Sequence, residues 1–176
     1  MRVMRHHAPR SDLSTHTVAN QSEPLVGVNW YADDAMLKSA LSRNGADVHA
    51  ERLSSMGAEV GSDGVQDLAR MANENPPRFK PFDRFGHRID EVEFHPAYHA
   101  LMRKAVSGGL QGSIWEEGGE ENGQRNFIRA LRFMLTCELE NGHTCPITMT
   151  NASVAVFMTE PHLVKDWLPR IVARQY

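Results

Sequence analysis

Two proline sites divide the chain and limit the folds open to it. A helical pattern runs up to Pro76-Pro77 and cannot continue through it, because proline lacks the backbone N–H and clashes with the preceding turn. A new helix is predicted to begin at Pro96, since proline suits the first helical position, and His95 is the expected cap. Residues 76–94 are therefore expected to form a long connection, which is often functional or interfacial.

Signals for strands inside this connection are weak. Asp83 to Gly86 is typical of a turn, and Ile89, Val92 and Phe94 alternate with polar residues. This alternation is compatible with a short extended piece but does not predict a convincing strand.

Helical periodicity accounts for most of the remaining chain. Apolar residues recur three or four positions apart, and glycines end several of these runs. Helices are predicted to begin near Asp33 or Asp34, Asp47, Ser62, Pro96, Gln124, Pro146 and Pro161. The predicted fold is all-α, a bundle of about seven helices in residues 33–176, preceded by an extended segment of residues 1–32.

Charged segments are predicted to face water. Residues 110–123 are rich in glycine and glutamate and are expected to form a solvated loop. In the helix of residues 124–141 the predicted core positions are Phe127, Leu131, Met134 and Leu135, and the predicted outward positions are Arg125, Arg129 and Arg132.

Some apolar residues need a partner that the pattern does not provide. The helix of residues 146–158 has almost no polar face, so it is predicted to be buried on every side or to line a ligand site. Aromatic residues also occur in segments without helical periodicity, and we expect these segments to pack at an interface. They are Trp30, Tyr31, Phe79, Phe82, Phe85 and Phe94.

Charge and composition disfavour several classes of function. The formal net charge of −3 gives no general attraction to phosphate, so a nucleic-acid interface has no electrostatic support. The longest uncharged run, residues 144–159, is shorter than the ~20 apolar residues that span a bilayer. The first ten residues contain no apolar run of a secretory signal, so Cys137 and Cys145 are expected to be reduced thiols of a cytoplasmic protein.

One metal-site pattern competes with a structural interpretation. His95 and His99 are four residues apart, the spacing of helical zinc ligands, and Asp90, Glu91 and Glu93 lie just upstream. As the expected cap, however, His95 directs its side chain away from the helix face. Structural histidines and solvated acids are therefore the favoured interpretation, and neither a metal site nor a catalytic acid–base pair is predicted.

Long motifs in a fixed order resemble a known family. They are THTVANQ at residues 15–21, LARMANENPP at residues 68–77, HRIDEVEFHPAYH at residues 87–99, WEE at residues 115–117, RALRFML at residues 129–135 and CPITMT at residues 145–150. Together they resemble the N-terminal domain of the AidB-like branch of the acyl-CoA dehydrogenase family of flavoproteins. The resemblance covers residues 15–176.

The resemblance implies a longer parent protein with further domains. Members have an N-terminal helical domain, a middle β-barrel and a C-terminal helical bundle, and FAD lies between the last two. The implied parent reaction is FAD-dependent α,β-dehydrogenation of an acyl-CoA by a homo-oligomer. The family is also associated with DNA, which this fragment does not support. The fragment alone is expected to be inactive and to bind FAD poorly.

The resemblance also places part of this chain beside the ligand. The helix that matches residues 146–158 forms one wall of the acyl crevice in the family. The implied crevice residues are Pro146, Ile147, Thr148, Met149 and Thr150. An alternative from another class is a stand-alone, non-catalytic helical module that docks another protein.

Overall fold

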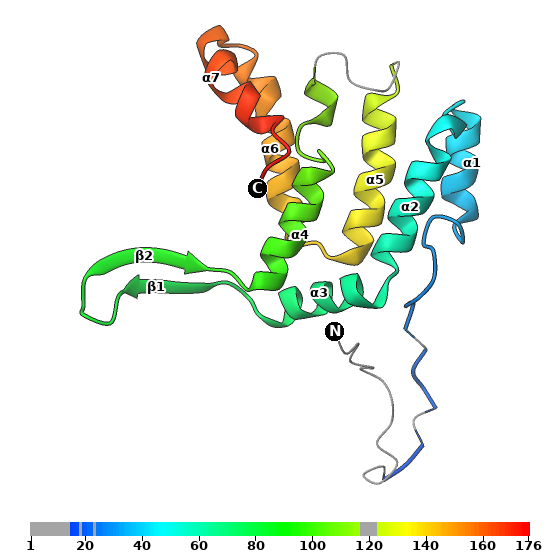
Figure 1. Cartoon of the computed structure of the whole chain (residues 1–176), viewed down its shortest axis with the longest axis horizontal. Coiled ribbons are helices and arrows are strands. Elements are labelled where there is room, and N and C mark those ends of the chain that lie inside the picture. Colours follow the sequence, from blue (N-terminus) through cyan, green and yellow to red (C-terminus); the bar gives the residue numbers. More distant parts are fainter. Residues whose placement is uncertain (1–14, 18, 23, 117–122) are drawn as a thin grey trace.

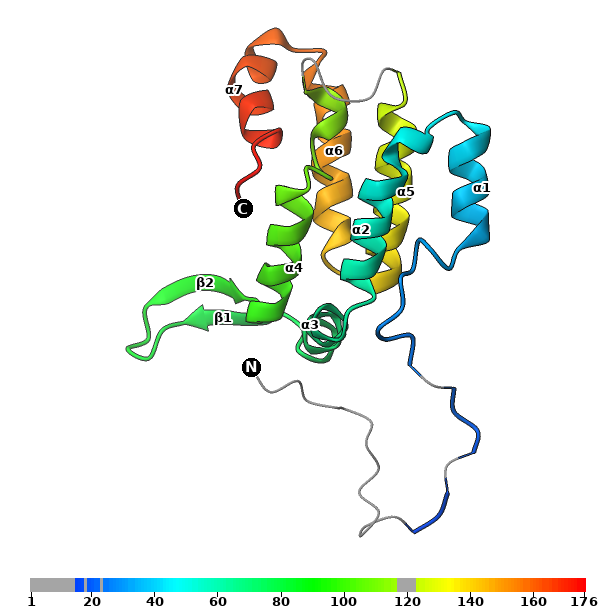
Figure 2. The same ribbon diagram turned by 45° about the vertical axis from the view of Figure 1, so that its right-hand side comes forward.

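A helical bundle makes up most of the structure. The computed structural model describes residues 15–17, 19–22, 24–116 and 123–176, so the predictions for the N-terminal tail and for residues 117–122 lie outside the described residues. The described residues form seven α-helices: α1 (Ala35–Arg43), α2 (Ala50–Val60), α3 (Asp63–Glu74), α4 (Pro96–Ser107), α5 (Arg125–Leu139), α6 (Thr144–Phe157) and α7 (Pro161–Ile171). The predicted all-α class and the number of helices are confirmed. Figures 1 and 2 show α2, α4, α5 and α6 alongside one another, with α3 across one end.

Local capping chemistry sets several helix starts. Asp34 accepts hydrogen bonds from the backbone N–H groups of Met36 and Leu37, at 2.7 and 2.9 Å, and so satisfies two donors at the start of α1. His95 caps α4 as predicted, since its Nδ1 accepts from the N–H of Ala97 at 3.2 Å. None of the described helices is long and apolar enough to cross a membrane.

The start of α2 differs from the prediction. Asp47 does not cap an α-helix but opens a single 3-10 turn, η1 (Asp47–His49), and α2 begins only at Ala50. The tighter turn changes the direction of the chain between α1 and α2.

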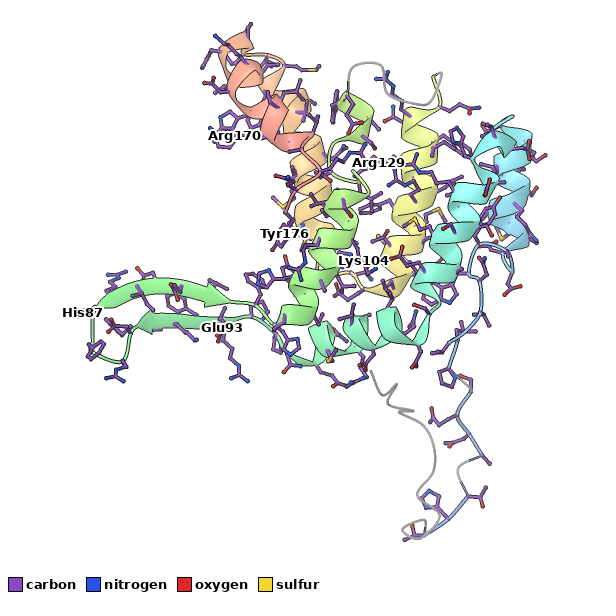
Figure 3. All side chains as sticks on the ribbon, viewed as in Figure 1. His87, Glu93, Lys104, Arg129, Arg170 and Tyr176 are labelled. Atoms are coloured by element: carbon purple, nitrogen blue, oxygen red, sulfur yellow. The ribbon has the colours of Figure 1, made fainter. Side chains whose placement is uncertain are left out.

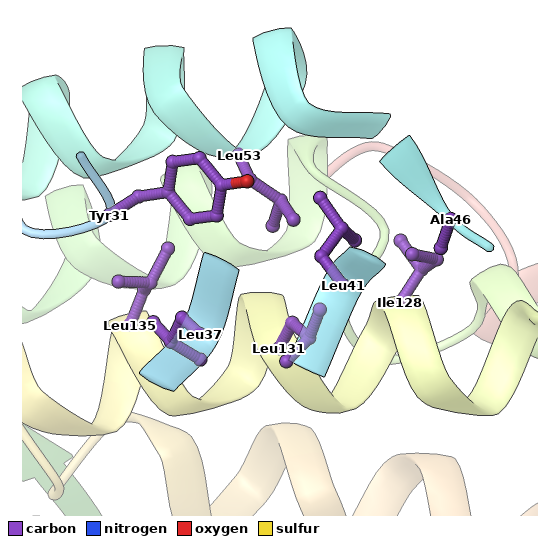
Figure 4. Close-up of a cluster of buried hydrophobic side chains, with 8 residues drawn as sticks. All are labelled: Tyr31, Leu37, Leu41, Ala46, Leu53, Ile128, Leu131 and Leu135. Carbon is purple, nitrogen blue, oxygen red and sulfur yellow. The ribbon is translucent and has the colours of Figure 1, made fainter. Parts of the chain in front are cut away.

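Two hydrophobic clusters form the core. The first joins α1, α2 and α5 and is drawn in Figure 4: Tyr31, Leu37, Leu41, Ala46, Leu53, Ile128, Leu131 and Leu135. The second joins α4 to α6: Met102, Ala105, Val106, Leu110 and Ile147. Full burial of a leucine or isoleucine side chain contributes about 1.5–3 kcal/mol, so these clusters dominate the stability of the bundle.

The described part of the N-terminal segment packs closely on α2. The N–H of Gly27 donates to Gly61 O at 2.7 Å, and the Asn29 side chain donates to Ser54 O at 2.9 Å. Tyr31 is buried in the first cluster, so the prediction that these aromatic residues pack at an interface with another domain or subunit is wrong for this residue.

The connection of residues 76–94 contains a β-hairpin, which corrects the prediction of no convincing strand. Strand β1 (Arg78–Phe82) pairs antiparallel with β2 (Arg88–Glu93), and Phe79 lies opposite Val92. The register shifts between Lys80 and Phe82, where β2 carries an extra residue, and Asp90 has a φ of 47° there. A bulge of this kind bends and twists the strand, which explains why simple alternation did not reveal it.

The predicted orientation of the α5 arginines is wrong. Arg132 is only 5% exposed, whereas Met134, a predicted core residue, is exposed. The guanidinium groups of Arg132, Arg129 and Arg125 donate in turn to the carbonyl oxygens of Gly108, Leu110 and Glu116. Arg129 Nε lies 2.7 Å from its acceptor, and burial lowers the pKa of this guanidinium. We call these three residues the arginine ladder.

The ladder fixes a segment that was predicted to be solvated. Leu110 and Gln111 are buried, and residues 113–115 form a 3-10 turn, η2 (Ser113–Trp115). Backbone carbonyls in such a segment require donors, and the ladder provides them. The prediction of a solvated loop is therefore wrong for residues 110–116.

Candidate functional site

The start of α6 is held by a short capped turn. Glu140 accepts hydrogen bonds from the N–H groups of Gly142 and His143, at 2.6 and 2.9 Å, and from His143 Nδ1 at 2.7 Å. Burial raises the pKa of the Glu140 carboxyl, but these hydrogen bonds outweigh it and lower the pKa below 4.5. The turn thus fixes where α6 begins.

Hydrogen bonds attach the middle of α6 to the segment of residues 111–115. Asn151 donates from Nδ2 to Gln111 O at 3.1 Å, and Trp115 Nε1 donates to Asn151 O at 3.1 Å. Gln111 in turn donates to Ala173 O at 2.8 Å, which fastens the last described residues to the same segment. Because these bonds lie on one side of α6, the helix cannot rotate about its axis without breaking them.

The opposite side of α6 is apolar and exposed. Met149 is 67% exposed and Val156 is 66% exposed, and Met158 just after the helix is also exposed. Of the two alternatives predicted for this helix, burial on every side does not hold for the described chain, in which a single side is buried. That the helix lines a ligand site stays a prediction. We call the side formed by Thr148, Met149, Ala152, Ala155 and Val156 the α6 face.

The five residues predicted for the acyl crevice are divided between the two sides of α6. Thr148 and Met149 are exposed, and Pro146 and Thr150 are half-buried. Ile147 is 2% exposed and belongs to the second core cluster. Thr148 and Met149 are thus available to a ligand, whereas Ile147 supports the helix from behind.

The neighbouring helix extends the apolar surface. The ring of Phe157, the last residue of α6, stacks near the ring of Trp167 in α7, with centroids 6.1 Å apart. Trp167 is partly exposed. The guanidinium of Arg170 lies 5.5 Å from the Trp167 ring, which is within the range of a cation–π contact. Figure 3 places Arg170 on α7 above the C-terminal segment.

The histidines considered as metal ligands have other partners. His95 caps α4, and His99 Nδ1 lies 2.8 Å from the Tyr176 hydroxyl. Among the described residues, no group of three histidine, cysteine or acidic side chains could hold a metal ion. Two of the upstream acids pair with bases in the hairpin, Glu93 with Lys80 and Asp90 with Arg88, each at 2.8 Å.

A cavity of about 570 Å³ lies between α2, α4 and α5. An ion pair between Lys104 and Glu59 joins α4 to α2 at this cavity, and Arg132 and His143 are among its lining residues. Arg132 already donates to Gly108 O, and His143 already contacts the Glu140 carboxylate. None of the predicted crevice residues lines this cavity.

Comparison with known proteins identifies the family. A sequence profile described as the adaptive response protein AidB N-terminal domain matches residues 20–176. The chain belongs to this family. The AidB N-terminal domain is thus the unit that the seven helices and the hairpin form, and the predicted resemblance is confirmed.

A curated relative shows how much of the protein this domain represents. The chain is 38% identical over 164 residues to the putative acyl-CoA dehydrogenase AidB of Escherichia coli K12. The match covers 92% of this chain but only 30% of that protein. The AidB N-terminal domain described here therefore spans less than a third of the relative's length.

Solved structures show the same fold at lower identity. Caenorhabditis elegans ACDH-11, solved in complex with C11-CoA, matches with a TM-score of 0.74 at 20% identity, over 96% of this chain and 30% of that chain. Bd2924 in its apo form matches with a TM-score of 0.74 at 21% identity, over 84% of this chain and 30% of that chain. These matches establish the fold of the AidB N-terminal domain.

The residues that hold α6 in place were not predicted from the sequence. Asn151 and Gln111 are 40 positions apart, and each bonds to main-chain atoms. Asn151 carries the one amide in a helix whose other polar side chains are small hydroxyls and a thiol, and this was the available signal, because a buried amide requires partners.

Proposed function

We propose that the α6 face forms one wall of an acyl-chain crevice in a longer AidB-like flavoprotein. The observation that carries the proposal is a helix fixed on one side by hydrogen bonds and presenting exposed methionine and valine on the other. Large apolar side chains left exposed on a rigid helix are typical of ligand or protein contacts. ACDH-11, a protein of the same fold, was solved in complex with C11-CoA, which supports an acyl-CoA as the ligand.

The α6 face suits an acyl chain better than a flavin. It offers methyl and thioether groups with the Thr148 hydroxyl, and its described side chains carry no charge. The diphosphate of FAD requires cations or convergent N–H donors, so the residues of this face do not form an FAD site. We infer that FAD is bound by other domains of the parent, where it would accept a hydride during α,β-dehydrogenation of the acyl-CoA.

A cytoplasmic location is part of the proposal. Both cysteines are free, and Cys145 is exposed at the start of α6. Free, exposed thiols are compatible with a reducing compartment.

Photo-crosslinking tests the proposed contact. The chain would be irradiated with C11-CoA that carries a diazirine at the end of the acyl chain, and labelled peptides would be mapped by mass spectrometry. We expect labelling to concentrate on the α6 face, and Met149→Glu to reduce it roughly fivefold, equivalent to ~1 kcal/mol, because a charge there opposes apolar contact.

Met36→Glu is the matched control. Met36 is also an exposed methionine, but it lies on α1 in the opposite part of the bundle, so the same charge change should leave labelling of α6 unchanged. Labelling spread over the surface, or labelling of α6 that Met149→Glu does not alter, would refute the crevice assignment.

A further inference from the structure

Helices α2, α4 and α5 surround a cavity whose lining residues take no part in the proposed acyl crevice. Helix α2 packs on α3 and α5, and α4 packs on α3 and α6, whereas α4 makes few close approaches to α2 or α5 among the described residues. The space between these three helices is the cavity of about 570 Å³ described above. Sites for small molecules have volumes of ~300–1,000 Å³, so the cavity has the size of a ligand site. We call it the inter-helix cavity.

The inner wall of the inter-helix cavity is largely apolar. Helices α2 to α5 and the segment after α4 each contribute a buried or half-buried aliphatic side chain: Val60, Val65, Leu101, Leu110 and Leu139. Such a wall favours a ligand whose body is a hydrocarbon group, because moving that group out of water is favourable.

The charged groups of the inter-helix cavity carry an excess of positive charge. Three bases and two acids line it: Arg52, Lys104 and Arg132 against Glu51 and Glu59. A surplus of positive charge beside apolar walls attracts an anion and repels a cation. One surplus base suits the single charge of a carboxylate better than the roughly −1.5 to −2 charge of a phosphate ester.

Lys104 is the cation that a ligand carboxylate can engage at low cost. Its ammonium group pairs with the Glu59 carboxylate, and the two side chains are 42% and 52% exposed. Figure 3 labels Lys104 on α4. An ion pair as exposed as this one contributes little to stability, and an ammonium group has three N–H donors. Lys104 can therefore donate to a second carboxylate without destabilising the bundle.

A buried histidine gives the inter-helix cavity a second polar group. His143 lines the cavity, and its side chain is only 1% exposed. Glu140 holds His143 Nδ1 at 2.7 Å, so Nε2 is the ring nitrogen that can bond to a ligand. The lowered pKa of Glu140 keeps this carboxyl charged, so it accepts the Nδ1 proton. In the neutral imidazole Nε2 is then an acceptor, which suits a ligand hydroxyl.

From these observations we propose that the inter-helix cavity binds a small carboxylate with an apolar body. The ligand carboxylate lies at Lys104, the body lies against Val60, Leu101 and Leu139, and a hydroxyl at the other end of the ligand donates to His143 Nε2. The site is separate from the α6 face, so the proposal does not depend on the acyl crevice.

NMR titration of the isotope-labelled 176-residue chain with p-hydroxyphenylpropionate tests this proposal. We expect saturable shifts at concentrations of ~1 mM, as is usual for so small a ligand, concentrated on the amides of α2, α4 and α5 around the cavity. The matching alcohol, p-hydroxyphenylpropanol, keeps the shape but lacks the carboxylate, and should bind at least fivefold more weakly. Phenylpropionate lacks the hydroxyl and should also bind more weakly.

Two charge variants test the position of the carboxylate. Lys104→Gln should weaken binding of p-hydroxyphenylpropionate at least fivefold and leave binding of the alcohol unchanged. Arg103→Gln is the matched control, because Arg103 is the exposed neighbour on α4 and does not line the cavity. It removes the same charge and should bind the acid as the wild type does.

Two tryptophan variants test the position of the apolar body. Ser55 is exposed on α2 and lines the cavity, so the indole of Ser55→Trp should block it and abolish binding of both the acid and the alcohol. Ala58 is also exposed on α2 but does not line the cavity, so Ala58→Trp should leave binding unchanged.

Three outcomes would overturn the proposal. The first is the absence of saturable shifts with p-hydroxyphenylpropionate. The second is a set of shifts confined to the α6 face, which would place the probe in the acyl crevice instead. The third is an equal loss of affinity for the acid and the alcohol in Lys104→Gln, which would show that the cavity does not recognise the negative charge. Equal affinities for p-hydroxyphenylpropionate and phenylpropionate would overturn the contact with His143.

Discussion

The carboxylate of Glu140 illustrates how one side chain fixes the site. Three donors from Gly142 and His143 converge on it, and they lower its pKa although burial alone would raise it. A carboxyl with a lowered pKa in the folded state stabilises the fold above its ordinary value of 4.5. That contribution is lost as the pH falls from 4.5 through the lower, folded-state pKa.

Glu140→Gln should remove this part of the pH dependence. Urea unfolding between about pH 3 and 6 would show the wild type losing stability below about pH 4.5, with a smaller loss in the variant. The variant should also be less stable at neutral pH, since a neutral amide is a weaker acceptor for His143 and Gly142. Parallel curves for the two proteins would show that the capped turn contributes nothing to acid stability.

Helix α2 is positioned by a close approach of its backbone to the N-terminal segment. A Cβ atom on Gly57 would lie 2.4 Å from Asn29 Oδ1 and 2.6 Å from Tyr31 N. Separations this short are not tolerated, so a larger residue must push the segment away from α2. Gly64 in α3 has nothing within 4 Å of its Cβ position.

Alanine at these two positions should have opposite effects. We expect Gly57→Ala to destabilise the chain by about 1–3 kcal/mol, as overpacking does. Gly64→Ala should stabilise it by about 0.4–1 kcal/mol, because alanine restricts the unfolded chain and favours a helix. Thermal or urea unfolding gives the change in unfolding free energy for both variants. If the two substitutions changed it equally, Gly57 would not be closely packed against Asn29 and Tyr31.

The helices were predictable from the sequence because their signals are local. Asp34 and His95 lie within three residues of the N–H groups that they cap, so the sequence alone indicates where α1 and α4 begin. The hairpin was not predictable, because Pro81 interrupts one strand and the Asp90 bulge breaks the alternation of the other. The arginines of the ladder donate to main-chain carbonyls that lie 9 to 24 positions earlier in the sequence. Since every residue has such a carbonyl, the pattern of side chains gives no indication of which ones are the acceptors.

The candidate site was predictable only in part. The apolar character of α6 indicated that the helix is unusual, and the family resemblance directed attention to residues 146–150. Neither observation could indicate that Ile147 faces inward while Met149 faces out. That division depends on the bonds of Asn151 to a distant segment.

Across the whole molecule, the arginine ladder connects the two hydrophobic clusters. It extends from α5, which contributes to the first cluster, to the segment that follows α4 in the second. Phe133 of α5 adds an apolar contact with the second cluster. Cooperative unfolding of the bundle should therefore depend on these links.

Arg132→Met should weaken this link at a cost of about 1–3 kcal/mol, because the half-buried Gly108 O would lose a charged donor. Native-state hydrogen exchange should then show the amides of α4 and α6 opening before those of α2. Arg103→Met is the control, since Arg103 is an exposed arginine on α4 and its loss should change stability by under ~0.5 kcal/mol. Uniform exchange in the Arg132 variant would argue against the ladder as the link.

The composition of the first cluster has a consequence for synthesis on the ribosome. Leu37, Leu41 and Leu53 precede the hairpin, whereas their partners Ile128 and Leu135 follow it. The newly made α1 and α2 must therefore wait until residues 61–135 have been added, roughly 4–15 s at ~5–20 residues per second. During that interval their leucines have no native partner on α5, so this is the period in which a nascent chain is most exposed to chaperones and to aggregation.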